Sequence, residues 1–292
     1  MLLLIFGLSS LAYCYYNRTE DGLFSFLIVI SFLFIIRQEW YISALSISLL
    51  IYSILFVKRT SYEQMMVFSI VGAIIFGYFL FNFFIYNFVK HTSILLFSAI
   101  ILMCYLSIKG IFEDDLEKYL IISNFIQVLF MFLYLLATNV QGKLLPLGII
   151  QIFNYTFSGT LLFLTIGVLS KDNRRIKVSQ LRGSIYRNPF VTFCAIVALL
   201  SLAGLPGLNM FYGRWLLIKD AYLISPVTTA LLIFLIVLIL VMYFKIIYVL
   251  SSGESKVIEK TPFLINLVII LFLLTSIILG IPTVQEYLLG LI

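Results

Sequence analysis

The most informative stretch of this sequence is Ser201-Leu-Ala-Gly-Leu-Pro-Gly-Leu-Asn209, which lies in an otherwise apolar segment. Pro206 removes a backbone hydrogen-bond donor, and Gly204 and Gly207 loosen the chain beside it, so a helix is expected to break here. Broken backbone at membrane depth is tolerated only where protein or a water-filled cavity satisfies the freed polar groups. We therefore predict a discontinuous transmembrane helix over residues 189–221.

The whole chain has the composition of a membrane domain. Of its 292 residues, 63% are hydrophobic and 11% are charged, which excludes the average composition of a soluble domain. A bilayer-spanning helix needs ~20 mostly apolar residues, so we predict an all-α polytopic membrane protein with a single membrane domain over 1–292. It has about ten transmembrane helices, one of them discontinuous at Leu205-Pro206-Gly207. The ten predicted segments are Leu2–Tyr16, Gly22–Ile36, Trp40–Phe56, Gln64–Phe88, Thr92–Ile108, Tyr119–Thr138, Leu145–Leu169, Pro189–Ala221, Pro226–Leu250 and Phe263–Ile281.

Basic residues in the connectors give the chain two unequal faces. With ten helices, the connectors of one face hold thirteen Lys and Arg and those of the other face hold four. The positive-inside rule places the first face in the cytoplasm or matrix, and both termini on the periplasmic or intermembrane-space side. The net charge of +6 is therefore interpreted as a topology signal, not as a sign of nucleic-acid binding. The basic connector 171–187 makes anionic lipids, such as cardiolipin, a secondary candidate partner.

Two further features are interpreted as structural. Leu2 to Tyr13 lacks a basic leader and is not followed by small residues at a cleavage site, so a retained helix is favoured over a signal peptide. Cys14, Cys104 and Cys194 all lie inside apolar segments, where they predict packing and neither a metal site nor a disulfide framework. We predict no metal and no cofactor on this chain.

Two basic residues, Arg214 and Lys245, lie inside predicted spans. An ionisable group at mid-membrane costs ~3 kcal/mol or more and usually marks a functional site, unless its side chain snorkels to the interface. Lys245 is five residues from the end of its predicted helix, so snorkelling is an alternative there. Arg214 lies eight residues beyond Pro206, ~12 Å along the second half-helix. A broken helix with a cation nearby indicates ion or proton handling more sharply than either feature alone.

These stretches resemble a known family, the antiporter-like subunits of respiratory complex I, and most strongly the smallest of them, NADH dehydrogenase subunit 2. The resemblance is carried by Pro189-Phe190, Leu200–Leu208, Gly213-Arg-Trp215, Val241–Tyr248 and Leu116–Asn124. It extends over residues 110–250. We therefore expect an antiporter-like half at 111–292 and a divergent N-terminal half at 1–110.

The resemblance implies a place in the membrane arm of NADH:ubiquinone oxidoreductase, beside other membrane-arm subunits and without redox chemistry on this chain. NADH, FMN, iron–sulfur clusters and ubiquinone are implied elsewhere in the complex. The implied location is the mitochondrial inner membrane, with a prokaryotic plasma membrane as the alternative. In this family, protons pass along buried lysines, a glutamate and water. Arg214 occupies the place of a buried lysine, Lys245 that of a basic residue on the next helix, and Ser123, Asn124 and Gln127 form a candidate polar path.

The chain departs from the family in ways that bear on proton transfer. The family's first broken helix cannot be found between Tyr62 and Gly110, Ser48 aligns with the family's glutamate, and no Asp or Glu lies well inside a predicted span. Because arginine stays protonated in proteins, Arg214 can supply a field but cannot relay a proton. We expect a contribution to proton translocation that is smaller than in the relatives, or a role mainly in assembly and coupling. Since relatives use lysine there, Arg214→Lys is expected to be tolerated.

Two other functions remain open at this point. The chain could be a subunit of a prokaryotic cation/proton antiporter or membrane-bound hydrogenase, which share the broken-helix motif. Alternatively, it is a non-catalytic membrane scaffold whose proline break has no functional role. The partners that co-purify with the chain distinguish these functions.

Overall fold

The fold is seen in a computed structural model that describes residues 92–141, 146–170, 176–254 and 261–291. Within these residues the structure is helical and contains no strand, apart from one isolated bridge between Asp115 and Lys177. The elements are α5 (Thr92–Phe112), α6 (Leu116–Gln141), α7 (Pro146–Ser170), η1 (Val178–Leu181), α8 (Ser184–Arg187), α9 (Pro189–Ala203), α10 (Asn209–Ile224), α11 (Pro226–Ser251), α12 (Phe263–Ile278) and α13 (Pro282–Leu291).

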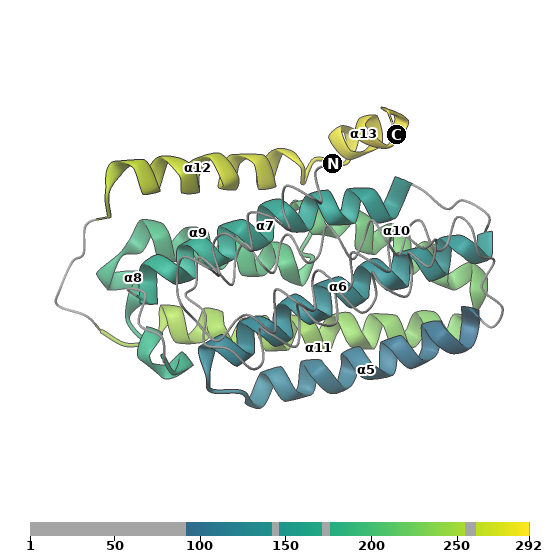
Figure 1. Cartoon of the computed structure of the whole chain (residues 1–292), viewed down its shortest axis with the longest axis horizontal. Coiled ribbons are helices and arrows are strands. Elements are labelled where there is room, and N and C mark those ends of the chain that lie inside the picture. Colours follow the sequence, from purple (N-terminus) through teal and green to yellow (C-terminus); the bar gives the residue numbers. More distant parts are fainter. Residues whose placement is uncertain (1–91, 142–145, 171–175, 255–260, 292) are drawn as a thin grey trace, which may run out of the picture.

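The long helices pack side by side around the broken pair α9–α10. Helix α5 packs against α6 and α11, and α7 packs against α9 and α6. Helix α12 lies across α7 and α9 on the side opposite α5 and α11 (Figure 1). The buried core joins residues from all of these helices, so the region around α9 and α10 is enclosed by protein.

Local sequence explains two helix starts. The Asp115 carboxylate accepts the backbone N–H groups of Glu117 at 3.0 Å and Lys118 at 3.3 Å, which satisfies free donors at the start of α6. Helix α9 begins with the Asn188 side chain accepting the Val191 N–H at 3.3 Å, and Pro189 occupies its first position.

Four described helices are long and apolar enough to cross a membrane: α5, α6, α7 and α11. A fifth span results if α12 and α13, which bend by 86° at a short break, count as one, and α9 is a shorter apolar helix. Each of the six predicted segments from Thr92 onward coincides with a helix or, for 189–221, with the broken pair. The four predicted segments before Thr92, and with them most of the N-terminal half, lie outside the described residues, so the number ten stays a prediction.

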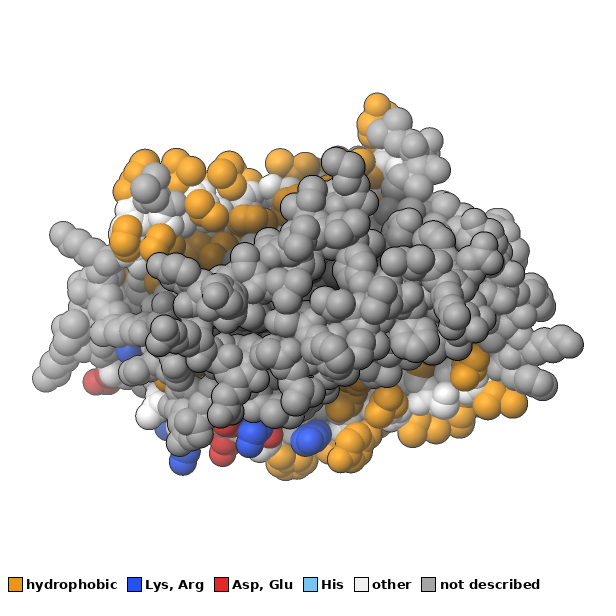
Figure 2. All heavy atoms as spheres, in the orientation of Figure 1, with side chains coloured by type: hydrophobic (Ala, Val, Ile, Leu, Met, Phe, Trp, Pro, Cys, Tyr) orange, Lys and Arg blue, Asp and Glu red, His pale blue; other side chains and the backbone are white. Residues whose placement is uncertain are grey.

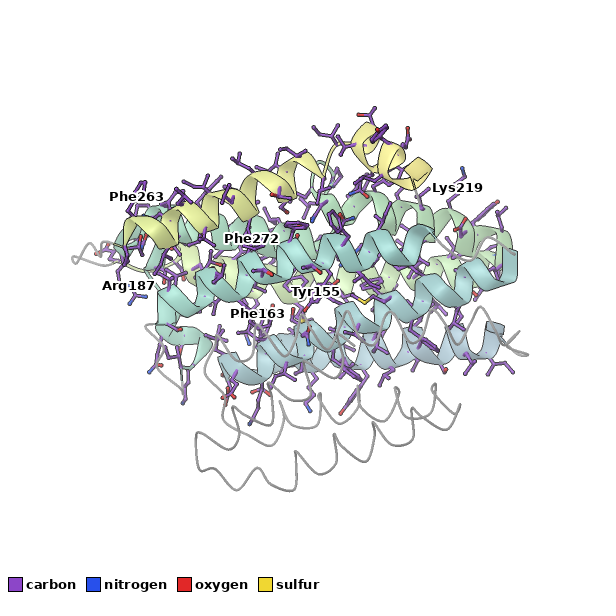
Figure 3. All side chains as sticks on the ribbon, turned by 45° about the horizontal axis from the view of Figure 1, so that its top comes forward. Tyr155, Phe163, Arg187, Lys219, Phe263 and Phe272 are labelled. Atoms are coloured by element: carbon purple, nitrogen blue, oxygen red, sulfur yellow. The ribbon has the colours of Figure 1, made fainter. Side chains whose placement is uncertain are left out.

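Side-chain chemistry on the surface fits a membrane-embedded bundle. Hydrophobic side chains line the two long edges formed by α12 and α5, while Lys, Arg, Asp and Glu gather at one end of the lower edge (Figure 2). Arg187 and Lys219, which the sequence assigns to opposite faces, lie at opposite ends of the bundle (Figure 3). The side of the membrane that each end faces stays a prediction.

Three elements are absent from the sequence-based prediction. The connector between α7 and α9 contains η1 and α8, and a further helix, α13, follows the last predicted span. Of the cysteines, Cys194 is buried and Cys104 partly buried, and both are free thiols. Cys14 lies outside the described part of the chain.

Candidate functional site

The helix break has the position that Pro206 predicts. Helix α9 ends at Ala203 and α10 begins at Asn209, with five non-helical residues between them. Gly204 adopts φ 78°, in the left-handed region that glycine enters without strain, and its N–H bonds to the carbonyls of Leu200 and Ser201. The prediction of interrupted helical hydrogen bonding is therefore confirmed.

Arg214, on α10, reaches back across this break. Its side chain is only 2% exposed, and its guanidinium donates hydrogen bonds to the carbonyls of Ala203 and Leu202. A longer bond, 3.5 Å, goes to the Oε1 atom of Gln127 on α6. The guanidinium carbon lies 4.5 Å from the ring centroid of Phe130, a cation–π distance. The prediction that Arg214 faces the protein interior is confirmed.

These contacts complete the hydrogen bonding of the C-terminal end of α9. A helix leaves its last four carbonyls without intrahelical partners, and here those belong to residues 200–203. The first two accept N–H groups of the turn, and the last two accept Arg214. A cation at this end also opposes the negative end of the helix dipole, worth ~0.3–1 kcal/mol when exposed and up to ~2 kcal/mol when partly buried. Arg214 is thus a C-terminal cap supplied by the following half-helix.

The break also needs glycine at position 204 for reasons of space. A Cβ atom on Gly204 would lie 2.5 Å from Cδ and 2.9 Å from Nη1 of Arg214. The arginine side chain therefore lies directly against the glycine that ends α9. The two residues that the sequence singles out separately form one structural unit.

Two of the three residues predicted to form a polar path, Ser123 and Gln127, are linked by hydrogen bonds to Arg214. The Ser123 hydroxyl lies 2.7 Å from the Tyr243 hydroxyl, and Gln127 Nε2 donates to that same hydroxyl at 3.0 Å. Gln127 also donates to the Leu202 carbonyl at 3.1 Å. Ser123, Tyr243, Gln127 and Arg214 therefore form one hydrogen-bonded chain between α6, α11 and α10. Their role in proton transfer stays a prediction.

Asn124 belongs to a different contact. Its Oδ1 atom accepts a hydrogen bond from the Tyr155 hydroxyl of α7, so its side chain is directed to the α6–α7 interface.

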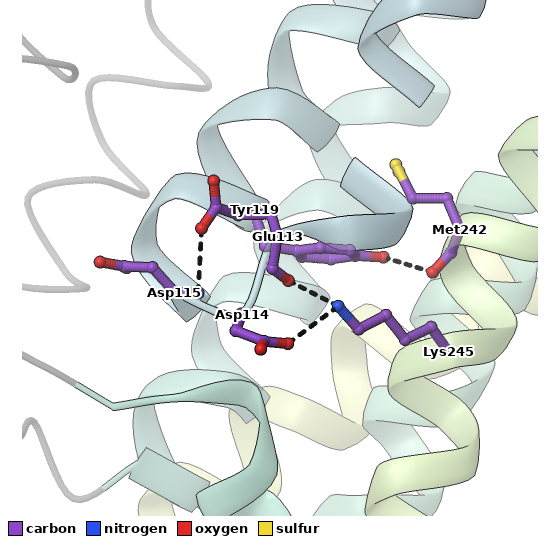
Figure 4. Close-up of polar contacts among 6 residues, drawn as sticks. All are labelled: Glu113, Asp114, Asp115, Tyr119, Met242 and Lys245. Carbon is purple, nitrogen blue, oxygen red and sulfur yellow. Dashed lines mark hydrogen bonds and ion pairs between the residues drawn. The ribbon is translucent and has the colours of Figure 1, made fainter. Parts of the chain in front are cut away.

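Lys245 contacts the loop between α5 and α6 (Figure 4). Its ammonium donates to the Glu113 carbonyl at 2.6 Å and lies 3.3 Å from the Asp114 carboxylate, in the loop between α5 and α6. The side chain of Lys245 is 23% exposed and that of Asp114 is 81% exposed. One turn away, the Tyr119 hydroxyl donates to the Met242 carbonyl at 3.0 Å. Lys245 therefore contacts a loop and lies apart from the hydrogen bonds at the break, and its role in a proton path stays a prediction.

A second polar cluster lies around Asn209, the first residue of α10, and sequence reasoning missed it. The amide of Asn209 donates to the Asn154 carbonyl at 2.9 Å, and its oxygen accepts the hydroxyls of Ser158, at 2.8 Å, and Ser201. The sequence of α7 does indicate a polar face, because Gln151, Asn154 and Ser158 recur at the three-to-four-residue spacing of one helix face. The cluster is completed by Ser276 and Gln285.

The site therefore combines one fixed cation with neutral partners. Arg214 is the only charged side chain among the buried residues of the described part of the chain. Those same parts hold no group of three His, Cys, Asp or Glu side chains that could bind a metal ion. Such a site can create a positive field beside a chain of hydroxyl and amide groups, and it offers no side chain that readily exchanges a proton.

A profile of a known protein family matches most of this region. The profile of the family described as "NADH:quinone oxidoreductase/Mrp antiporter, TM" matches residues 66–240, more than half of the chain and the whole of the broken pair. The chain belongs to this family. The resemblance found on the residues around the break is thereby confirmed, and the chain is an antiporter-like membrane subunit.

Individual relatives of the family are distant. The chain is 25% identical over 186 residues to NADH-quinone oxidoreductase subunit N of Cytophaga hutchinsonii, a match of 63% of this chain and 38% of the relative. It is 26% identical over 110 residues to a hydrogenase-4 component F homologue of Methylacidiphilum infernorum, a match of 37% of this chain and 23% of the relative. The matches thus span well under half of either relative.

The fold is shared with a chain of the membrane-bound sulfane sulfur reductase, an archaeal respiratory membrane complex. The two superpose with a TM-score of 0.68 at 17% identity, covering 99% of this chain and 69% of the other. The two chains therefore share a fold, although few of their residues are identical.

Proposed function

We propose that this chain is an antiporter-like membrane-arm subunit of a complex I-type NADH:quinone oxidoreductase. The observation that carries the proposal is the buried Arg214 that bridges a broken helix, within a chain of the NADH:quinone oxidoreductase/Mrp antiporter family. A broken helix that exposes half-helix ends to a buried charge is the device by which membrane transporters handle ions. The partners are then the neighbouring membrane-arm subunits, and NADH, FMN, iron–sulfur clusters and ubiquinone lie elsewhere in the complex.

Within that complex we assign the chain mainly to assembly and coupling. Arginine stays protonated, so Arg214 holds the two half-helices and supplies a constant field but does not pass on a proton. The hydroxyl and amide groups of Ser123, Gln127 and Tyr243 are neutral, and they end at this fixed cation. A proton crossing here needs water beside them, so the expected contribution to translocation is smaller than that of relatives with lysine at the break.

The membrane is the mitochondrial inner membrane or a prokaryotic plasma membrane, and the bacterial relative of the subunit N type supports the latter. Both termini are expected on the side opposite the basic connector 171–187.

Affinity purification of the tagged chain from its native membrane in mild detergent tests the proposal. We expect flavin- and iron–sulfur-containing subunits to co-purify, together with NADH:quinone reductase activity that the chain alone does not have. Recovery of the chain alone, or with partners lacking flavin and iron–sulfur clusters, would refute it.

A second candidate is a subunit of a membrane-bound hydrogenase or cation/proton antiporter complex. The similarity to a hydrogenase-4 component F homologue favours it. The same purification distinguishes it, because a hydrogenase would bring a hydrogen-oxidising or hydrogen-evolving activity in place of NADH oxidation.

A further inference from the structure

The corner between α12 and α13 lies directly on the helix break. After Ile278 the chain turns by 86° into α13, with Gly280 in the turn. A Cβ atom on Gly280 would collide with the Gly207 carbonyl oxygen and lie 2.9 Å from the Leu208 Cα. Backbone therefore meets backbone here, and Gly280 is required because any side chain would push the corner off the break.

Gln285, one turn into α13, extends this contact into the bundle. Its side chain is fully buried, and its amide group donates to the Asn209 carbonyl at 2.8 Å and to the Leu279 carbonyl. Its oxygen accepts the Asn154 amide at 3.2 Å. One glutamine therefore joins α13, the first residue of α10, and α7.

A second contact ties α13 to α10 at the surface. The Tyr212 hydroxyl donates to the Glu286 carboxylate at 3.2 Å. Gln285 and Glu286 thus hold the first turn of α10 at two points one turn apart. Arg214 holds α10 to the end of α9, whereas these two residues hold it to α13.

We propose that the α12–α13 corner is a clamp on the helix break, and that Gln285 is its positioning residue. The clamp fixes the first turn of α10, and so fixes where Arg214 meets the carbonyls of α9. Movement of α13 would loosen the first turn of α10, which Arg214 and the other contacts of Asn209 still hold to α9 and α7. Any effect on proton-coupled activity rests on the proposed function, but the positioning role does not.

Thiol labelling at the break tests the clamp in the intact complex. Cys14, Cys104 and Cys194 are first replaced by serine, and Leu208→Cys, partly buried at the break, becomes the reporter for a membrane-permeant maleimide. Gln285→Met, similar in size but unable to form the three bonds, should raise the labelling rate about fivefold or more, because the break then opens more often. Gln285→Glu keeps an acceptor but cannot donate to both carbonyls, so its labelling rate should also rise.

The control is Tyr287→Leu on the same helix, where Tyr287 is 69% exposed. With this substitution, the labelling rate of Leu208→Cys should stay within about twofold of its rate without the substitution. An unchanged rate in Gln285→Met, or an equal rise in both variants, would overturn the positioning role.

If the Gln285 variants do not assemble, the labelling rate of Tyr212→Phe tests the clamp instead, because this change removes only the surface contact to Glu286. A reproducible rise in labelling supports the clamp, and an unchanged rate refutes it. Labelling requires no enzymatic activity, so a negative labelling result counts against the clamp. The co-purification tests the proposed function separately.

Discussion

Replacing Arg214 by lysine keeps the positive charge but removes the fork that holds the break. The family resemblance alone predicts that this change is tolerated. The contacts of the Arg214 side chain predict instead that it destabilises the chain. The guanidinium donates from separate nitrogens to the Leu202 and Ala203 carbonyls and stacks on Phe130. An ammonium is a single strongly hydrated point that cannot reproduce this planar geometry.

The size of the effect follows from these contacts. At least one charge-assisted hydrogen bond is lost, worth ~1.5–3 kcal/mol, and a buried carbonyl is left without its donor. Loss of the guanidinium–ring contact adds ~0.5–2 kcal/mol. We therefore expect Arg214→Lys to destabilise the chain by about 3 kcal/mol, which lowers the melting temperature of a domain this large by about 5–10 °C.

The assay is thermal denaturation of the purified complex at one heating rate, followed with a thiol-reactive dye that reports exposure of buried Cys194. Lys219→Met is the matched control, because Lys219 is an exposed cation on the same helix. Its melting temperature should stay within about 2 °C of the wild type. An Arg214→Lys complex that melts as late as this control would refute the capping role.

Two other predictions rest on the described contacts, and a third rests on the basic residues of the sequence. Lys245→Met should destabilise the chain by less than ~1 kcal/mol, because the carboxylate partner of Lys245 is exposed. The difference in melting temperature between this variant and the wild type should shrink as salt is added. Gly204→Ala should cost ~2 kcal/mol or more, since it combines a left-handed φ of 78° with a clash on Arg214, and the same melting assay measures it. Protease added to sealed vesicles should cut the connector 171–187 only from the matrix or cytoplasmic side, and cleavage from the other side would overturn the topology.

Local sequence was enough to predict the break and its cation. Pro206 cannot continue the hydrogen bonding of a helix, and Gly204 can enter the left-handed region, so both act through their own backbone. The burial of Arg214 followed from its depth in an apolar segment, because a charge there must face protein. The helix segments from Thr92 onward followed from the length of apolar runs in the same way.

The partners of these residues could not be predicted because they come from distant parts of the chain. Gln285 lies 76 residues from Asn209, on a helix that begins at a proline and carries no span-length apolar run. Lys245 finds its acceptors 131 and 132 residues away, in a loop. Neutral amides such as Asn154 carry no charge pattern, so only the packing of α7 against α10 shows that they share a site.

The proton-to-electron ratio of complexes carrying Arg214→Met tests the central claim most directly. If Arg214 is a fixed cap that holds the break, the variant should lower the amount of assembled complex. The complex that does assemble should then pump, in sealed vesicles, the same number of protons per electron as the wild type. Normal assembly together with a reduced proton-to-electron ratio would contradict the account, because it would make Arg214 part of the proton path itself.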